Sequence, residues 1–187
     1  MGKIKVIAGR LIITSCILIT ILVAFMLIDQ KFNTQDLSKV SEYERVRAET
    51  FTTSMKMIWP ISLSSEIVKE FRLISYYDDV DAYTGYLRIE FNDRSIDSER
   101  ERLKSVGADD YKGKYNNSGF SAYEVLAIKT NETKGGKTDG YNGFTYALDA
   151  GNNEIIYVEL EFPRDTPRND YIKIIPDKYL PDGLEFY

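Results

Sequence analysis

The stretch IIYVELEF, residues 155–162, alternates large apolar side chains with tyrosine and glutamate. A period of two is typical of a β-strand that buries one of its faces. The stretch YLRIEF, residues 86–91, follows the same pattern. We therefore predict that these two strands turn six apolar side chains toward one core, where they contact a helix that carries Leu103: Leu87, Ile89, Phe91, Val158, Leu160 and Phe162.

Three further segments are short and rich in aromatic and β-branched residues: Phe71 to Tyr77, Ala122 to Ile128 and Phe144 to Leu148. The segment SIDSERERLKSVG, residues 95–107, instead has apolar residues at helical spacing, acids in its first turn and a closing glycine. Short links between the strands predict an antiparallel meander that this helix covers on one face. The predicted fold class is α+β with five strands.

Upstream of the strands, the sequence predicts one further helix. Asn33 is a good N-cap with Asp36 three residues later, and Trp59-Pro60 ends the segment because a residue before proline avoids the helical conformation. We predict a helix from about Thr34 to Met57. Four apolar residues fall roughly on one face of it: Leu37, Val40, Tyr43 and Val46.

The N-terminal region contains LIITSCILITILVAFMLI, residues 11–28, a run of 18 residues without a charge. As a helix it covers about 27 Å, close to the apolar thickness of a bilayer. A cleaved signal peptide has a shorter apolar region and ends in a small-x-small site, whereas this run ends in FMLIDQ. Lipidation at Cys16 is a third reading, but the uncharged run continues for 12 residues after that cysteine. We favour an uncleaved transmembrane anchor.

The basic residues predict the orientation of this span. Lys3, Lys5 and Arg10 precede it, and only Lys31 lies within ten residues after it. The positive-inside rule then gives a cytoplasmic N-terminus at residues 1–10, a transmembrane helix at 11–28, a juxtamembrane helical segment at 29–60 and an extracytoplasmic α+β domain at 61–187.

Composition excludes several function classes. The first 28 residues hold three of the 24 basic residues and none of the 29 acidic ones, so the rest of the chain has a net charge of -8, which argues against nucleic acid as its partner. The chain has no histidine, and its single cysteine is Cys16. The domain after the span can therefore have no disulfide, no Cys or His zinc site, no histidine-activated nucleophile and no haem histidine. We expect no cofactor and no structural metal.

Two motifs approach known ligand-binding loops without completing them. The segment KGGKT, residues 134–138, resembles the end of a phosphate-binding loop, but Asn131 replaces the required first glycine and turn residues, not a helix, follow Thr138. The segment 79–90 has acids at positions 1, 3 and 12 of a calcium loop, but Tyr83 stands at position 5. We predict a surface loop and a hairpin turn, with a weak calcium site at Asp79 and Asp81 as the alternative.

Taken together, the chain resembles small single-pass, membrane-anchored extracytoplasmic proteins of Gram-positive bacteria. The resemblance implies location and architecture, and it carries over no functional residue. Its elements are the basic N-terminus with one span, EFRLISYYDDV (70–80), YLRIEF (86–91), SIDSERERLKSV (95–106), IIYVELEF (155–162) and IIPDKYLPDG (174–183).

Two classes of function remain open from the sequence. The first is a non-catalytic domain that binds an unknown protein or cell-envelope component, with the loop from Asn131 to Gly143 as a second contact region. The second is a glycosidase-like hydrolase that uses two carboxylates from Glu90, Glu159 and Glu161. For the binding domain, the residues opposite the predicted core form the expected contact face: Tyr86, Arg88, Glu90, Tyr157, Glu159 and Glu161.

Overall fold

The computed structural model describes residues 14–24, 34–63, 67–77, 81–109, 119–132, 141–161 and 172–184. The chain divides into two compact units, Met1–Gln35 and Asp36–Tyr187. In the first unit, residues 14–24 form a helix. Residues 11–13 and 25–28 of the expected span lie outside the described residues, and no helix among those described is both long and apolar enough to cross a bilayer.

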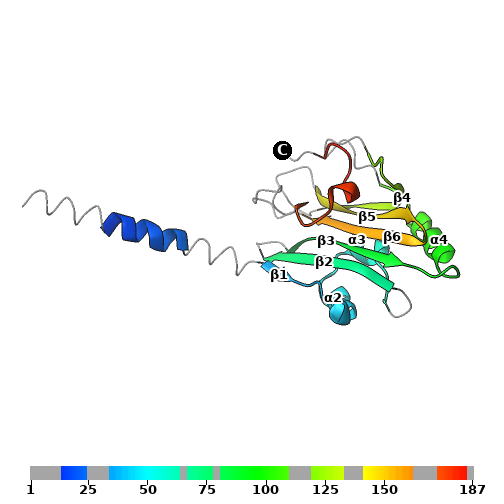
Figure 1. The fold of residues 1–187 in the computed structure, drawn as a ribbon, viewed down its shortest axis with the longest axis horizontal. Coiled ribbons are helices and arrows are strands. Elements are labelled where there is room, and N and C mark those ends of the chain that lie inside the picture. Colours follow the sequence, from blue (N-terminus) through cyan, green and yellow to red (C-terminus); the bar gives the residue numbers. More distant parts are fainter. Residues whose placement is uncertain are drawn as a thin grey trace, which may run out of the picture. The chain divides into compact units, whose positions relative to one another are not determined.

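The second unit is an α+β domain built on one sheet (Figure 1). The sheet has six strands in the order β1-β2-β3-β6-β5-β4, and the four pairings from β2 to β4 along this order are antiparallel. The strands are β1 (Thr34–Asp36), β2 (Ile67–Tyr77), β3 (Asp81–Glu90), β4 (Glu124–Glu132), β5 (Tyr141–Gly151) and β6 (Glu154–Glu161).

Five of the six strands lie where the sequence predicts them, but the expected count and connectivity are wrong. The additional strand is β1, at one edge. A simple meander would place β4 beside β3, whereas β6 occupies that position. After β3 the chain passes through helix α4 (Ile96–Val106), and an isolated parallel bridge between Ala108 and Ile128 then joins it to the opposite edge strand, β4. The sheet is therefore a β2–β3 hairpin joined to a β4–β5–β6 meander through the β3–β6 pair.

The predicted helix from Thr34 to Met57 is also wrong. After β1 the chain forms a 3₁₀ helix η1 (Val40–Glu42), helix α2 (Tyr43–Thr50) and helix α3 (Thr53–Ile58). Phe51 breaks the helix because its backbone is extended and its ring is buried against Tyr43 and Trp59. Thr52 then starts α3, since its hydroxyl accepts a hydrogen bond from the Met55 N–H at 3.1 Å. The expected end before Pro60 is confirmed.

Helix α4 confirms the sequence prediction closely. It ends at Gly107, whose φ of 79° lies in the left-handed region that glycine adopts without strain. Ile96 and Leu103 are buried on its inner side, with Val106 packed beside them.

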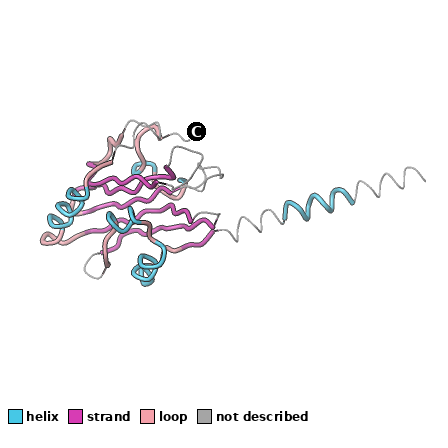
Figure 2. The backbone as a smooth tube through the Cα atoms, turned by 180° about the vertical axis from the view of Figure 1, so that it is seen from behind, coloured by secondary structure: helices cyan, strands magenta, loops and turns pink. Residues whose placement is uncertain are grey.

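Both faces of the sheet are buried, by different parts of the chain. We call the face covered by α2, α3 and α4 the helix face; it carries Leu87, Ile89, Ile155 and Tyr157. We call the other the C-terminal face, because residues 172–184, with the 3₁₀ helix η2 (Asp177–Tyr179), cover it (red in Figure 1; Figure 2 shows the reverse view). Its strand residues include Tyr86, Phe144, Tyr146, Ile156, Val158 and Leu160.

The predicted core of six side chains is therefore divided between the two faces. Leu87 lies opposite Tyr157, and Tyr86 lies opposite Val158. Residues directly opposite each other point to the same face, so Val158 and Leu160 turn away from α4. Phe91 belongs to the helix face, and Phe162 lies outside the described residues. A shift of one residue in the assumed register accounts for the error.

A polar network joins α4 to α3 and to the sheet. Arg102 of α4 donates to the Met57 and Ile58 carbonyls at 2.8 and 2.7 Å, which are among the carbonyls that the end of α3 leaves without a helical partner. The same guanidinium binds Glu99, and Glu99 accepts a hydrogen bond from the Tyr157 hydroxyl at 2.6 Å. Arg102 thus joins α4 to α3, and Glu99 joins α4 to β6.

Candidate functional site

The structure does not bring together the six residues expected to form one contact face. Tyr86, Arg88 and Glu90 of β3 lie on the C-terminal face of the sheet, whereas Tyr157, Glu159 and Glu161 lie on the helix face. Those three are also inaccessible: Tyr157 and Glu159 are 0% exposed and Glu161 is 8% exposed. The six residues therefore lie on opposite faces of the sheet. The cause is the same one-residue difference in register that divides the expected core.

The carboxylates of the hydrolase hypothesis are separated in the same way. Glu159 is buried in the sheet and accepts a short hydrogen bond from the buried Thr145 hydroxyl. Glu161 follows two residues later on the same strand face, about 7 Å along β6. Glu90 points to the opposite face and pairs with Lys69. Only Glu159 and Glu161 could act as a pair, and both are buried.

Two of the expected contact residues, Tyr86 and Arg88, lie in a polar and aromatic cluster on the C-terminal face. Arg88 donates through Nε and Nη2 to Glu154 Oε2 at 2.9 and 2.6 Å, so β3 is tied to the first residue of β6. Glu70 of β2 lies at 3.6 Å from the same guanidinium. Glu154 is the less exposed carboxylate, at 17% of its side chain, and Glu70 is 42% exposed.

The aromatic part of this cluster comes from three separate segments. Tyr179 of η2 packs edge-to-face against Tyr86, with ring centroids 5.5 Å apart, and Tyr123, just before β4, lies at 6.1 Å from it. The Tyr146 hydroxyl donates to the Tyr179 carbonyl at 2.8 Å and fixes the backbone of η2. The Lys178 ammonium lies 5.1 Å from the centroid of the Tyr179 ring. We call Tyr86, Tyr123, Tyr179, Glu70 and Arg88 the tyrosine site.

The electrostatic environment keeps these phenols protonated. Burial raises the pKa of Tyr179 to about 12, and the nearby Glu70 carboxylate acts in the same direction. Burial and Glu70 likewise raise the pKa of Tyr86. Both hydroxyl groups therefore remain neutral donors at physiological pH, and the charges of the site belong to Arg88 and its two carboxylates.

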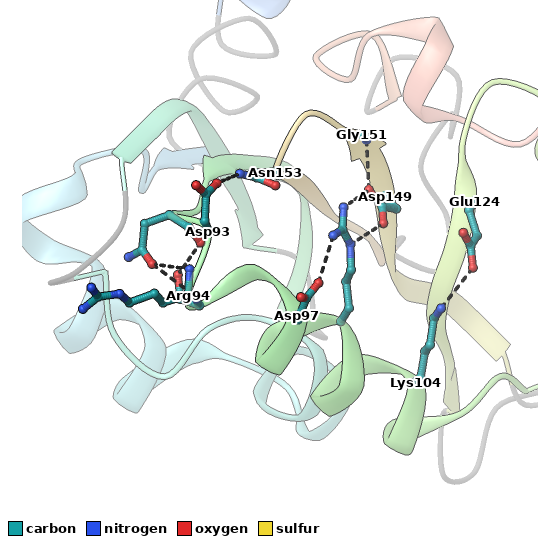
Figure 3. Close-up of polar contacts among 11 residues, drawn as sticks. Asp93, Arg94, Asp97, Lys104, Glu124, Asp149, Gly151 and Asn153 are labelled. Carbon is teal, nitrogen blue, oxygen red and sulfur yellow. Dashed lines mark hydrogen bonds and ion pairs between the residues drawn. The ribbon is translucent and has the colours of Figure 1, made fainter.

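A second polar cluster joins the start of α4 to the β5–β6 turn (Figure 3). Arg100 donates to both carboxylate oxygens of Asp149, at 2.7 and 3.2 Å, and Asp149 also accepts from the Gly151 N–H. The Asn153 side-chain amide donates to Asp93 at 2.6 Å. In these contacts each carboxylate is bound by a guanidinium, a backbone N–H or a side-chain amide. The cluster therefore has a structural role, which is to attach α4 to the sheet.

The described residues provide no evidence for a metal site or for a contact region in the loop from Asn131 to Gly143. No group of three potential metal ligands occurs in the part of the chain that the structure describes. Asp79 lies outside that part, and only the backbone of Asp81 within it, so the calcium alternative is not tested. Residues 133–140 of the Asn131–Gly143 loop also lie outside it.

Sequence reasoning missed most of the tyrosine site. Glu70 is the fourth residue of β2 and Tyr123 precedes β4, positions to which period two assigns no special role, and Tyr179 comes from a segment that the sequence does not place against the sheet. The one available signal was IIPDKYLPDG, which contains Lys178 and Tyr179 and has apolar residues without strand or helix periodicity.

Comparisons with known proteins give this chain no relatives. No protein-family model, no curated protein and no solved structure matches it.

Proposed function

We propose that this protein is a membrane-anchored, extracytoplasmic binding domain without catalytic activity, and that it contacts a protein or cell-envelope partner through the tyrosine site. The anchor is supported by the uncharged run at residues 11–28 with three basic residues before it. The domain itself is compact from Asp36 onward. With this orientation of the anchor, the domain would bind its partner on the outer side of the membrane.

The observation that carries the binding role is the composition of the tyrosine site. Tyrosine and arginine are enriched where proteins bind partners, because each combines a large contact area with a hydrogen-bonding group. Tyr86 and Tyr179 are themselves buried, at 9% and 1% exposed, so the accessible part of the site is the half-buried Tyr123 ring and the Arg88 side chain, which is 28% exposed. Glu70, more exposed than either, adds an acceptor beside them.

A hydrolase has less support. Two-carboxylate catalysis needs both groups to reach the substrate from opposite sides of the bond that is cleaved. Glu159 is fully buried, and Glu90 lies on the opposite side of the sheet from it. The lack of histidine also excludes a nucleophile activated by histidine.

Topology is tested with protease on intact, wall-stripped cells that express the full chain. We expect digestion of the domain and retention of the N-terminal segment in the membrane fraction after carbonate washing. Resistance of the domain until the cells are lysed would show that the orientation is wrong.

Partner binding is tested by cross-linking on the same intact cells, followed by capture of the full chain. Arg88→Gln should lower the yield of cross-linked partner at least severalfold. The matched control is Arg45→Gln, because Arg45 lies on α2, which covers the other face, and its ion pairs with Glu42 and Glu49 are exposed. Equal partner yield from both variants, with unchanged melting temperatures, would place the contact elsewhere.

A further inference from the structure

We propose that the tyrosine site binds an organic ammonium group, primary or quaternary, in the position that the Lys178 side chain now occupies over Tyr179. This inference rests on the proposed binding function, but it does not depend on the membrane anchor.

The first observation is that the site already holds a cation on an aromatic ring. The Lys178 ammonium lies 5.1 Å from the centroid of Tyr179, within the distance of about 6 Å at which the negative face of a ring attracts a positive charge. Lys178 is exposed, and its long side chain can turn into solvent at little cost. Tyr179 is only 1% exposed with Lys178 in this position, so a ligand ammonium reaches the ring by taking the place of the Lys178 side chain.

The second observation is the arrangement of the neighbouring rings. Tyr86 is inclined at 62° to Tyr179, and Tyr123 at 48°. The three rings are therefore far from coplanar, and they come from β3, from the approach to β4 and from η2. Several rings at large mutual angles are the arrangement by which proteins recognise ammonium ligands.

The third observation is the charge next to the rings. Arg88 gives its two short hydrogen bonds to Glu154, and its separation from Glu70 is 3.6 Å. Glu70 is thus the less tightly held carboxylate, and it lies close enough to Tyr86 and Tyr179 to raise the pKa of both phenols. A cation beside these rings would gain a carboxylate partner. An anion would have to displace Glu154 from Arg88.

The test uses the full chain in maltoside micelles, a detergent without an ammonium headgroup. Choline and ethanolamine are the probes, and their proton signals are followed by saturation-transfer NMR against sodium chloride at equal ionic strength. We expect saturable binding in the millimolar range. Tyr123→Leu and Glu70→Gln should each weaken it about 3- to 10-fold, because each removes one attraction for the cation.

Lys178→Ala provides the discriminating variant. Because it empties the position over Tyr179, it should strengthen choline binding about 3-fold or more, whereas a merely structural tyrosine cluster would not respond in this direction. The matched control for Glu70→Gln is Glu49→Gln, an exposed carboxylate on α2 that should leave binding unchanged.

Two results would overturn the proposal. One is the absence of saturable binding by both the wild type and Lys178→Ala up to about 100 mM probe. The other is weaker binding by Lys178→Ala. If cross-linked partner capture still depends on Arg88 in either case, the ammonium ligand is rejected and the binding function is retained.

Discussion

The helix face of the sheet is closed by three helices, whereas the C-terminal face is closed by residues 172–184, which are mostly irregular and include the three-residue helix η2. Closing a face with helices leaves orphan carbonyl groups at helix ends, and Arg102 supplies the donors for those of α3. The mostly irregular C-terminal segment is instead held to its face by aromatic packing, such as that of Tyr179 against Tyr86. The first solution binds the Arg102 guanidinium to backbone carbonyls, whereas the second leaves Arg88 paired with carboxylates beside the rings.

This difference suggests a division of roles. The helix face holds the largest buried side chain, Trp59, and a partly buried hydrogen-bond network that joins α4 to α3 and β6. The C-terminal face carries Arg88 and Glu70, which remain partly exposed. We expect substitutions on the helix face to change stability most, and substitutions at the tyrosine site to change binding with smaller effects on stability.

Trp59→Ala should have the largest effect. The ring is 0% exposed and contacts Phe51, Phe71 and Tyr157, so its loss removes apolar contacts and leaves a large cavity. We expect the free energy of unfolding to fall by about 3 to 5 kcal/mol in urea denaturation. A loss below about 1 kcal/mol would contradict the central role of the helix face.

Arg102→Ala should come next. It leaves Glu99 without its cation and the carbonyls of Met57 and Ile58 without a donor, so we expect a loss of about 2 to 4 kcal/mol in the same assay. The control is Arg45→Ala, whose ion pairs are exposed and contribute at most about 0.5 kcal/mol. Similar losses from the two variants would show that the network is not what fastens the helices.

Tyr146→Phe tests the attachment of the C-terminal segment. It removes one buried hydrogen bond to the Tyr179 carbonyl and keeps the ring, so the expected loss is about 1 to 2 kcal/mol. Hydrogen exchange should report faster opening at residues 172–184 while α4 keeps its protection. Equal acceleration in both regions would mean that the two faces open as one unit.

Asp149→Asn should have the smallest effect, with a dependence on pH. Burial works to raise the pKa of Asp149, but hydrogen bonds from Arg100 and the Gly151 N–H prevail and lower it. The folded protein therefore holds this proton less tightly than the unfolded chain, and the carboxylate stabilises the fold above the unfolded pKa of about 3.9.

At pH 7 the variant should thus be less stable by about 1 kcal/mol. The difference from the wild type should disappear as the pH falls below about 4 and the wild-type carboxylate takes up its proton. Melting temperatures measured from pH 7 to pH 3 give this comparison. A constant difference over the whole range would show that the ionised form of Asp149 is not what matters.

From β2 onward, the sequence by itself determined which segments are strands and where α4 lies. Period two located β2 to β6, and Gly107 with the first-turn acids located α4, because local side-chain spacing reports which residues can share a face. The absence of histidine likewise excludes whole classes of chemistry without any structure. The antiparallel α+β fold follows from these elements.

Only the tertiary structure decided how the strands pair and which face each side chain occupies. Because both faces of this sheet are buried, the alternating pattern of β6 does not show which set of side chains faces the helices. The pairing of Leu87 with Tyr157 places the set that contains Tyr157 on the helix face. β1 exists through contacts distant in sequence, such as the Leu37 N–H to the Leu73 carbonyl beside it. The tyrosine site joins β2, β3, η2 and the start of β4, so no local pattern could have assembled it. Spacing along the chain fixes periodicity, whereas register and long-range packing depend on the cooperative fit of the whole sheet.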